Sequence, residues 1–284
     1  MNTAVAPRFI AEVSSNHNQD LDRCRAFIDC AADLGCYAVK FQLFRIEQLF
    51  SPEVLARSEA HRRRKAWELP AAFIPELAVR CRLKGIQFCC TPFDLHAVEI
   101  LKPHVDLYKI ASYELLWDAL LRACGGSGKP VVLSTGMADM TEVGHAVSVL
   151  RQTDCKDWSL LHCSSAYPAP PEHCNLAAIE TMRKAFVCNV GWSDHSHHPG
   201  VVIRAVHRWQ AHLVEFHLDL DREGAEYQTG HCWLPEEIRP VIQAATLGAA
   251  ADGDGIKQPN PAEQPDRNWR ADPSDGLRPL KSER

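Results

Sequence analysis

Short apolar runs alternate along the chain with longer amphipathic stretches. The runs cover residues 8–13, 37–41, 85–89, 106–110, 130–134, 158–162, 186–190 and 211–216, and each reads as a strand. Apolar positions at helical spacing cover residues 20–34, 70–83, 141–150, 175–185, 199–209 and 235–247. Alternating strands and helices favour parallel pairing, and eight such units in about 250 residues predict a closed (β/α)8 TIM barrel.

The same pattern predicts one α/β domain followed by an irregular tail. We expect residues 1–250 to form the catalytic barrel, and no GxGxxG motif follows the first strand to suggest a dinucleotide-binding sheet. Residues 44–69 are longer than a usual connection, so we expect a loop with some helix that faces the active site. Residues 251–284 show no periodicity, which leaves either a segment packed near the active site or a solvated, disordered tail.

Two histidines follow the last two predicted strands. His195 stands in Gly191-Trp-Ser-Asp-His195 and His217 in Val214-Glu-Phe-His217. Active sites of (β/α)8 barrels lie at the C-terminal ends of the strands, and imidazole is the commonest metal ligand. This placement predicts a divalent metal site that keeps open positions for substrate. The alternative is that both are ordinary histidines among the fourteen in the chain.

Polar side chains collect at the other predicted strand ends. They are Glu12, Lys40, Gln42, Thr91, Lys109, Ser112, Glu114, Ser134, Ser164, Ser165, Tyr167 and Ser193. Two ammonium groups and a row of hydroxyls suit a small polyanion, and the carboxylates Glu12 and Glu114 could bind hydroxyls or move protons. Each residue alone also has a structural interpretation: Lys40 could pair with a barrel carboxylate, and Ser134 could cap a helix.

Composition excludes several classes of function. Hydrophobic residues make up 46% of the chain and charged residues 24%, and the formal net charge of −5 gives no sign of a nucleic-acid or membrane-surface partner. No apolar run has the length of a membrane span, and the N-terminus lacks the features of a signal peptide. The twelve cysteines form no CxxC motif, so we expect free thiols in a cytoplasmic protein.

A series of short motifs stands in order along the chain. They are Ile10-Ala-Glu12, Asn16-His-Asn18, Ala38-Val-Lys-Phe-Gln42, Thr91-Pro-Phe-Asp94, Lys109-Ile-Ala-Ser112-Tyr-Glu114, Leu133-Ser-Thr-Gly-Met137, His162-Cys-Ser-Ser-Ala-Tyr-Pro168, Ser193-Asp-His195, Glu215-Phe-His217 and Gly253-Asp-Gly-Ile-Lys257. From about Phe9 to Lys257 the chain therefore resembles the sialic acid (N-acetylneuraminate) synthase family. The motif ending at Pro168 is most similar to that of the relatives that make pseudaminic and legionaminic acids.

The resemblance implies a condensation of phosphoenolpyruvate (PEP) with the open-chain aldehyde of an N-acetylated hexosamine. Phosphate leaves by C–O cleavage, and the product is a nine-carbon 3-deoxy-2-ulosonic acid. In this family a divalent metal, typically Mn²⁺ with Mg²⁺ or Co²⁺ as alternatives, is held by histidines that match His195 and His217. Residues matching Lys40, Lys109, Thr91, Ser112, Ser134 and Ser193 hold PEP. The acid matching Glu12 acts near the reacting carbons, and the acid matching Glu114 binds the sugar.

The chain departs from the family pattern at three places. It ends before the usual C-terminal antifreeze-like domain, so the usual swapped dimer and sugar contacts are not expected, although a homo-oligomer through other barrel faces stays open. Glu226 stands where the family has a sugar-binding Asp, and Ser165 stands where it has a PEP-contacting Asn. The arginines and aspartates of residues 267–278 could replace some of the missing contacts.

Two further functions compete with a PEP-dependent synthase. One is a Schiff-base pyruvate aldolase, because a desolvated lysine such as Lys109 at a barrel strand end can form an imine. The other is a catalytically inactive barrel that binds PEP or a sugar. The presence of Glu12, both lysines and both histidines argues against the inactive barrel.

Overall fold

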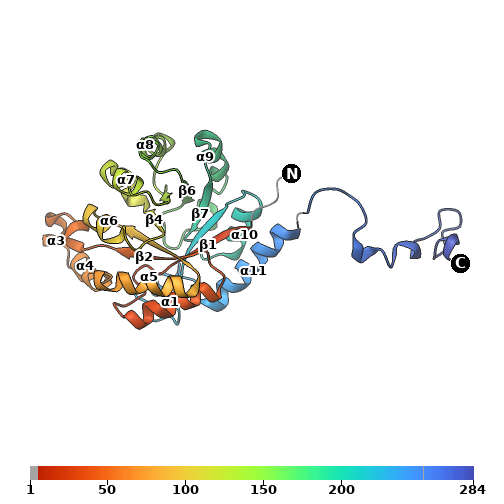
Figure 1. Ribbon diagram of the computed structural model, residues 1–284, viewed down its shortest axis with the longest axis horizontal. Helices are drawn as coiled ribbons and strands as arrows, with labels where there is room; N and C mark the ends of the chain where they lie inside the picture. Colours follow the sequence, from red (N-terminus) through yellow and green to blue (C-terminus); the bar gives the residue numbers. More distant parts are fainter. Residues whose placement is uncertain (1–5, 252) are drawn as a thin grey trace. The chain divides into compact units, whose positions relative to one another are not determined.

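Eight parallel strands close into a barrel in the computed structural model, which describes residues 6–251 and 253–284, the side chain of residue 249 excepted (Figure 1). The strands are β1 (Arg8–Glu12), β2 (Ala38–Leu43), β3 (Gln87–Pro92), β4 (Leu107–Ile110), β5 (Val131–Ser134), β6 (Trp158–Cys163), β7 (Val190–Asp194) and β8 (Leu213–His217). Strand β8 closes the ring by pairing with β1, so that His217 lies opposite Glu12. The predicted (β/α)8 TIM barrel is confirmed.

Helices cover the outside of the barrel (Figure 1). They are α1 (Leu21–Asp33), α5 (Ile74–Lys84), α6 (Leu95–Leu101), α7 (Asp118–Gly125), α8 (Met140–Arg151), α9 (Ala178–Phe186), α10 (Pro199–His207) and α11 (Pro235–Ala251). Acidic side chains begin several of them: Asp20, Asp94 and Asp139 each accept hydrogen bonds from backbone N–H groups in the first turn. Helices α6 and α7 were not among the helices predicted from periodicity.

Two strands lie further along the chain than the sequence pattern predicts. The strand predicted at residues 85–89 is β3 at Gln87–Pro92, because Gly85 ends helix α5 in a left-handed conformation. The strand predicted at residues 186–190 is β7 at Val190–Asp194, because α9 continues to Phe186 and Val187 caps it with a φ of 50°. The correction places His195 directly after a strand, where a barrel active site lies.

The barrel has an inner and an outer apolar layer. Ile10, Ala38, Cys89, Leu107, Val132, Leu161 and Leu213 fill the inside of the barrel. A larger cluster packs the outer faces of the strands against the helices, and fully buried Trp192, Phe216 and Phe88 belong to it. With the inside filled by side chains, a polar site is left room only at the strand ends.

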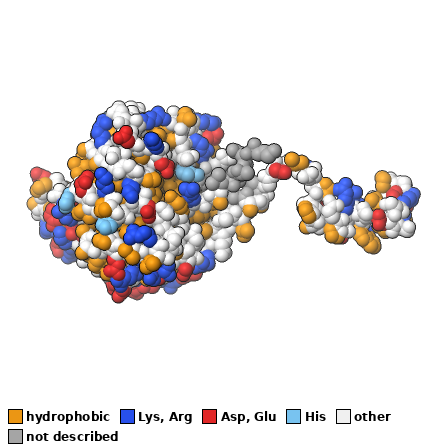
Figure 2. Space-filling view, in the orientation of Figure 1, with side chains coloured by type: hydrophobic (Ala, Val, Ile, Leu, Met, Phe, Trp, Pro, Cys, Tyr) orange, Lys and Arg blue, Asp and Glu red, His pale blue; other side chains and the backbone are white. Residues whose placement is uncertain are grey.

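The long connection after β2 contains helix, as predicted. Short helices α2 (Ile46–Leu49), α3 (Pro52–Arg57) and α4 (Glu59–Arg63) follow the C-terminal end of the strand. The connection is tied to the loop after β1, because the Gln19 amide donates to the carbonyl oxygens of Lys65 and Glu68. Acidic and basic side chains are interspersed over the face of the barrel shown in Figure 2, as expected for solvated helices.

Residues 250–284 group separately from the barrel. Beyond the end of α11 at Ala251, the described residues 253–284 contain only short turns of 3-10 helix, at Pro261–Glu263, Arg267–Trp269 and Lys281–Glu283. The division into a barrel and an irregular tail stays a prediction, as does the packing of the tail near the active site. All twelve cysteines are free thiols. Among the described residues, no helix is long and apolar enough to cross a membrane.

Candidate active site

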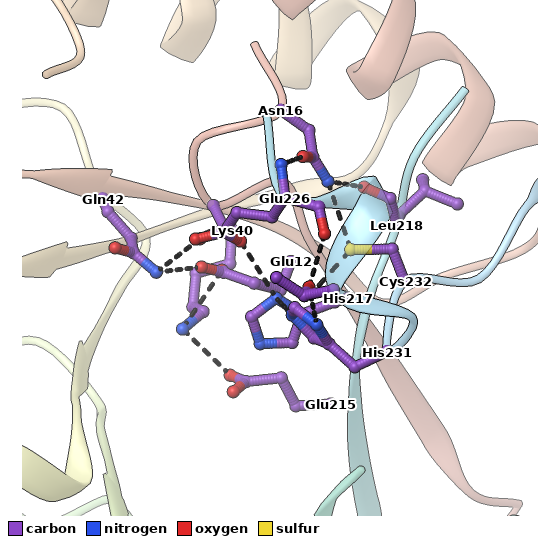
Figure 3. Close-up of polar contacts among 12 residues, drawn as sticks. Glu12, Asn16, Lys40, Gln42, Glu215, His217, Leu218, Glu226, His231 and Cys232 are labelled. Carbon is purple, nitrogen blue, oxygen red and sulfur yellow. Dashed lines mark hydrogen bonds and ion pairs between the residues drawn. The ribbon is translucent and has the colours of Figure 1, made fainter. Parts of the chain in front are cut away.

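A buried network of opposite charges lies at the C-terminal ends of β1, β2, β4 and β8. The Lys40 Nζ is 3.1 Å from Glu12 Oε2 and 3.3 Å from Glu215 Oε2, and the Lys109 Nζ is 3.6 Å from Glu215 Oε1. Ser193 donates a hydrogen bond of 3.0 Å to Glu215. Figure 3 shows Lys40 between the two carboxylates. The predicted pairing of Lys40 with a barrel carboxylate is therefore real, and Glu215 holds the two lysines together.

The network sets the charge of its members. Burial opposes ionisation of Glu215, but the ammonium groups of Lys109 and Lys40 outweigh it and lower the pKa of Glu215 to about 2. Burial raises the pKa of Glu12 to about 7, against the lowering influence of Lys40. Burial also lowers the pKa of Lys109. Glu215 is thus a fixed anion, whereas Glu12 can take up or release a proton near neutral pH.

Hydroxyl groups lie around the same end of the barrel. Thr91 Oγ1 is 3.5 Å from the Lys40 Nζ, and Ser112 Oγ accepts a 2.9 Å hydrogen bond from the Gly136 N–H. The hydroxyls of Ser134 and Ser165 are buried without a hydrogen-bond partner among the described residues. An unpaired buried hydroxyl is costly, so these groups suit an anion that accepts hydrogen bonds from them.

Gly136 gives these hydroxyls their space. A Cβ atom at position 136 would lie 2.2 Å from Ser165 Oγ, 2.8 Å from Cys163 Sγ and 2.9 Å from Ser112 Oγ. We expect Gly136→Ala to displace the hydroxyls and raise the KM for the anionic substrate by about tenfold, since overpacking costs about 1–3 kcal/mol. Steady-state kinetics measure this. Gly144→Ala is the matched control, because its Cβ would meet only Phe186, at 3.6 Å, and it should leave KM unchanged.

The two predicted metal ligands face each other at the ends of β7 and β8. Their ring centroids are 5.3 Å apart, and Tyr167 lies over His195 at 4.2 Å. His195 Nδ1 donates to the carbonyl oxygen of Ser164 at 2.7 Å, which leaves Nε2 with a free lone pair. Burial lowers the pKa of His195 to about 4 and that of His217 to about 3. Both rings are therefore neutral at pH 7, the state in which imidazole binds a metal.

Three further predicted residues complete the end of the barrel. Gln42 Nε2 donates to Glu12 and, at 3.2 Å, to Ser14 Oγ. Glu114 is buried just after β4, where desolvation raises its pKa to about 7, and its Oε2 has no hydrogen-bond partner in the described chain. Glu226 lies with Oε2 3.7 Å from His217 Nδ1. The carboxylates at 12 and 114 are thus both able to hold a proton near neutral pH.

Comparison with known proteins identifies the family. The NeuB family model matches residues 27–257. The chain belongs to the NeuB family. It is 38% identical over 263 residues to an uncharacterized protein of Methanocaldococcus jannaschii, covering 91% of this chain and 76% of that protein. It is 32% identical over 272 residues to the N,N'-diacetyllegionaminic acid synthase of Campylobacter jejuni, covering 91% and 81%.

A solved structure extends the similarity to the fold. The N-acetylneuraminic acid synthetase of Leptospira borgpetersenii, in complex with citrate, has a TM-score of 0.81 and 32% identity, covering 92% of this chain and 90% of that one. The resemblance to sialic, legionaminic and pseudaminic acid synthases is confirmed. As a member of this family the chain is a transferase-type condensing enzyme.

The structure brings most of the predicted residues of this NeuB-family site into three clusters. The first, the charge network, contains Glu12, Lys40, Gln42, Thr91, Lys109 and Ser193. The second contains Ser164, Tyr167, His195, His217 and Glu226. The third contains Ser112 and Ser165, around Gly136. Ser134 is the last residue of β5 and Glu114 follows the neighbouring strand β4. Ser134 Oγ and Glu114 Oε2 have no hydrogen-bond partner in the described chain.

Sequence reasoning missed Glu215, His231 and Asn16 as site residues. Glu215 is two residues before His217 in β8, and alternate residues of a strand point to one face, so this signal was available. Asn16 Nδ2 donates to the carbonyl oxygen of Leu218 and its Oδ1 accepts from the Glu226 N–H. His231 lies in a loop, where no periodicity could have connected it with His217.

Proposed function

We propose that this enzyme joins PEP to the aldehyde of an N-acetylhexosamine-type sugar and releases phosphate. The reaction uses a divalent metal, for which Mn²⁺ is the first candidate. The product is a nonulosonic, sialic-acid-like 3-deoxy-2-ulosonic acid. One observation carries the proposal: two buried lysines and unpaired hydroxyls lie at the same barrel end as two neutral histidines. Relatives named N,N'-diacetyllegionaminic acid synthase and pseudaminic acid synthase support the proposal.

The residues present fit the proposed metal. His195 and His217 are buried and neutral, and the Nε2 lone pair of His195 is free, while the carboxylate of Glu12, opposite His217 in the barrel, adds hard oxygen donors. His195 and His217 would hold the ion. When bound, it would polarise the carbonyl oxygen of the acceptor aldehyde.

The chain's own residues act on PEP and on protons. Lys40 and Lys109 offset the charges of the phosphate and carboxylate, and the hydroxyls of Thr91, Ser112, Ser134, Ser165 and Ser193 orient them. The C2=C3 electron pair of PEP forms a bond from C3 to the aldehyde carbon, and the aldehyde oxygen takes up a proton. Water adds to C2 and loses a proton. The C2–O bond to phosphate then breaks, the phosphate leaves with the electron pair, and the C2 hydroxyl passes its proton to the phosphate as the ketone forms. Glu12, with a pKa of about 7, can exchange the proton that the water loses.

The Schiff-base aldolase alternative depends on an uncharged Lys109. Burial lowers its pKa, which favours a nucleophilic amine, but Glu215 at 3.6 Å stabilises the ammonium. We expect no borohydride trapping of pyruvate on this lysine in metal-free protein. A stoichiometric adduct at Lys109 would favour the aldolase instead.

The test is phosphate release from PEP labelled with ¹⁸O in the bridging C–O–P position. Purified protein with Mn²⁺ is offered a panel of 2-acetamido and diacetamido sugars. Release should depend on the sugar, stop on chelation, and return the label in phosphate, because the C–O bond breaks. Label retained in the organic product, or release without any aldose, would contradict the proposed reaction.

A further inference from the structure

A line of hydrogen bonds leads away from His217 into the loop after β8. His217 Nδ1 lies 3.2 Å from His231 Nε2, and His231 Nδ1 lies 2.6 Å from Thr229 Oγ1. Thr229 Oγ1 in turn donates to the carbonyl oxygen of Glu226 at 2.5 Å. His231 is buried, with 3% of its surface exposed, and Figure 3 shows its ring beside that of His217.

The direction of each hydrogen bond in this line is fixed by its last member. A carbonyl oxygen only accepts, so the single hydroxyl proton of Thr229 points to Glu226. Thr229 Oγ1 must therefore accept from His231 Nδ1–H. A neutral imidazole carries one proton, so His231 Nε2 is an acceptor and His217 Nδ1 is the donor to it. The Nε2 lone pair of His217 is then left free.

We propose that His231 is a positioning residue that holds His217 in the tautomer and orientation needed to bind the metal. The inference rests on the proposed function, since it assumes a metal at His217. His231 does for His217 what the carbonyl oxygen of Ser164 does for His195, so both rings present Nε2. A hydrogen bond on the second ring nitrogen of a ligand is the usual means of fixing it.

The same residues could instead bind a metal directly. Ligand atoms of His217, His231 and Cys232 all lie within 4.8 Å of one another. Two contacts favour positioning. His217 Nδ1 is the nearer of two possible donors to the lone pair of His231 Nε2, at 3.2 Å against 3.8 Å for Cys232 Sγ, and Cys232 Sγ accepts from Asn16 Nδ2 at 3.5 Å. Glu226 does not compete for His217, because its Oε2 is 3.7 Å from Nδ1, beyond hydrogen-bond distance.

Metal binding by the metal-free protein tests the proposal without measuring activity. Calorimetric titration with Mn²⁺ should show that His231→Ala lowers affinity by about 10–100-fold, as expected for loss of such a partner. His231→Gln should restore most of the affinity, because its amide oxygen reaches the place of Nε2 and accepts from His217. His231→Asn is the matched control: it carries the same amide on a side chain one methylene shorter, and should not restore affinity.

Absorption spectra of the Co²⁺-loaded protein separate positioning from direct ligation. We expect no sulfur-to-cobalt charge-transfer band in the wild type and an unchanged spectrum in Cys232→Ser. Such a band, or wild-type affinity in His231→Ala, would overturn the proposal. His217→Ala separates failure of the proposed function from failure of the positioning role. If His217→Ala keeps wild-type affinity for Mn²⁺, the metal site of the proposed function is refuted. If His217→Ala loses that affinity and His231→Ala keeps it, only the positioning role of His231 is refuted.

Discussion

His217→Ala should reduce phosphate release from PEP by at least about a thousandfold. A bound metal contributes several kcal/mol to the stabilisation of charge in the transition state, and each 1.4 kcal/mol is about tenfold in rate. His217 is buried at the end of β8, opposite Glu12 and 5.3 Å from His195, so its loss removes one of the two proposed metal ligands. The measurement is phosphate release at saturating PEP and sugar with Mn²⁺.

The control is a histidine outside the site. His145 lies on α8 with 55% of its side chain exposed and pairs only with Asp118, so His145→Ala should keep full activity. Circular dichroism and the Tm of both variants establish that they are folded. Wild-type phosphate release by His217→Ala would exclude this histidine as a metal ligand.

The barrel could be predicted from the sequence because its signal is repeated eight times. Each strand places a run of apolar residues between two layers of core, and errors at single boundaries do not alter the alternation. The boundaries were less well determined. Residues 186–190 contain an apolar run, but helix α9 uses Phe186 and the strand begins at Val190. Local periodicity could not decide which element would bury those residues.

The site was partly predictable for a different reason. The end of a strand is a position along the chain, so His195, His217, Lys40 and Lys109 could be assigned to the end of the barrel. Contacts across the barrel are set by closure, which joins β8 to β1 and brings Glu215 within reach of both lysines. The contact of His231 with His217 depends on the path of an irregular loop, and no pattern in the sequence encodes that path.

Glu215→Gln should lower the free energy of unfolding by about 3–5 kcal/mol at pH 7, because it leaves the buried ammonium of Lys109 without its anion. The side chain of Glu215 is 4% exposed and lies 3.6 Å from the Lys109 Nζ and 3.3 Å from the Lys40 Nζ. Glutamine keeps the shape and can still accept from Ser193, so the change isolates the charge. Urea unfolding of both proteins measures the change in the free energy of unfolding. A decrease of less than about 1 kcal/mol, as for exposed ion pairs, would contradict a buried network.

The companion variant removes the lysine that Glu215 serves. In Lys109→Met with Glu215→Gln no unpaired ammonium is left at this position, so much of the lost stability should return, and the double-mutant cycle gives the coupling energy.

The contribution of Glu215 to stability depends on pH with a defined sign. The pKa of Glu215 is lowered to about 2 in the folded state, so its contribution is complete above the ordinary carboxyl value of 4.5 and is lost as the pH falls toward 2. The stability gap between wild type and Glu215→Gln should therefore narrow as the pH falls from 4.5 toward 2, because the unfolded wild-type chain binds a proton at Glu215 that the folded protein does not bind.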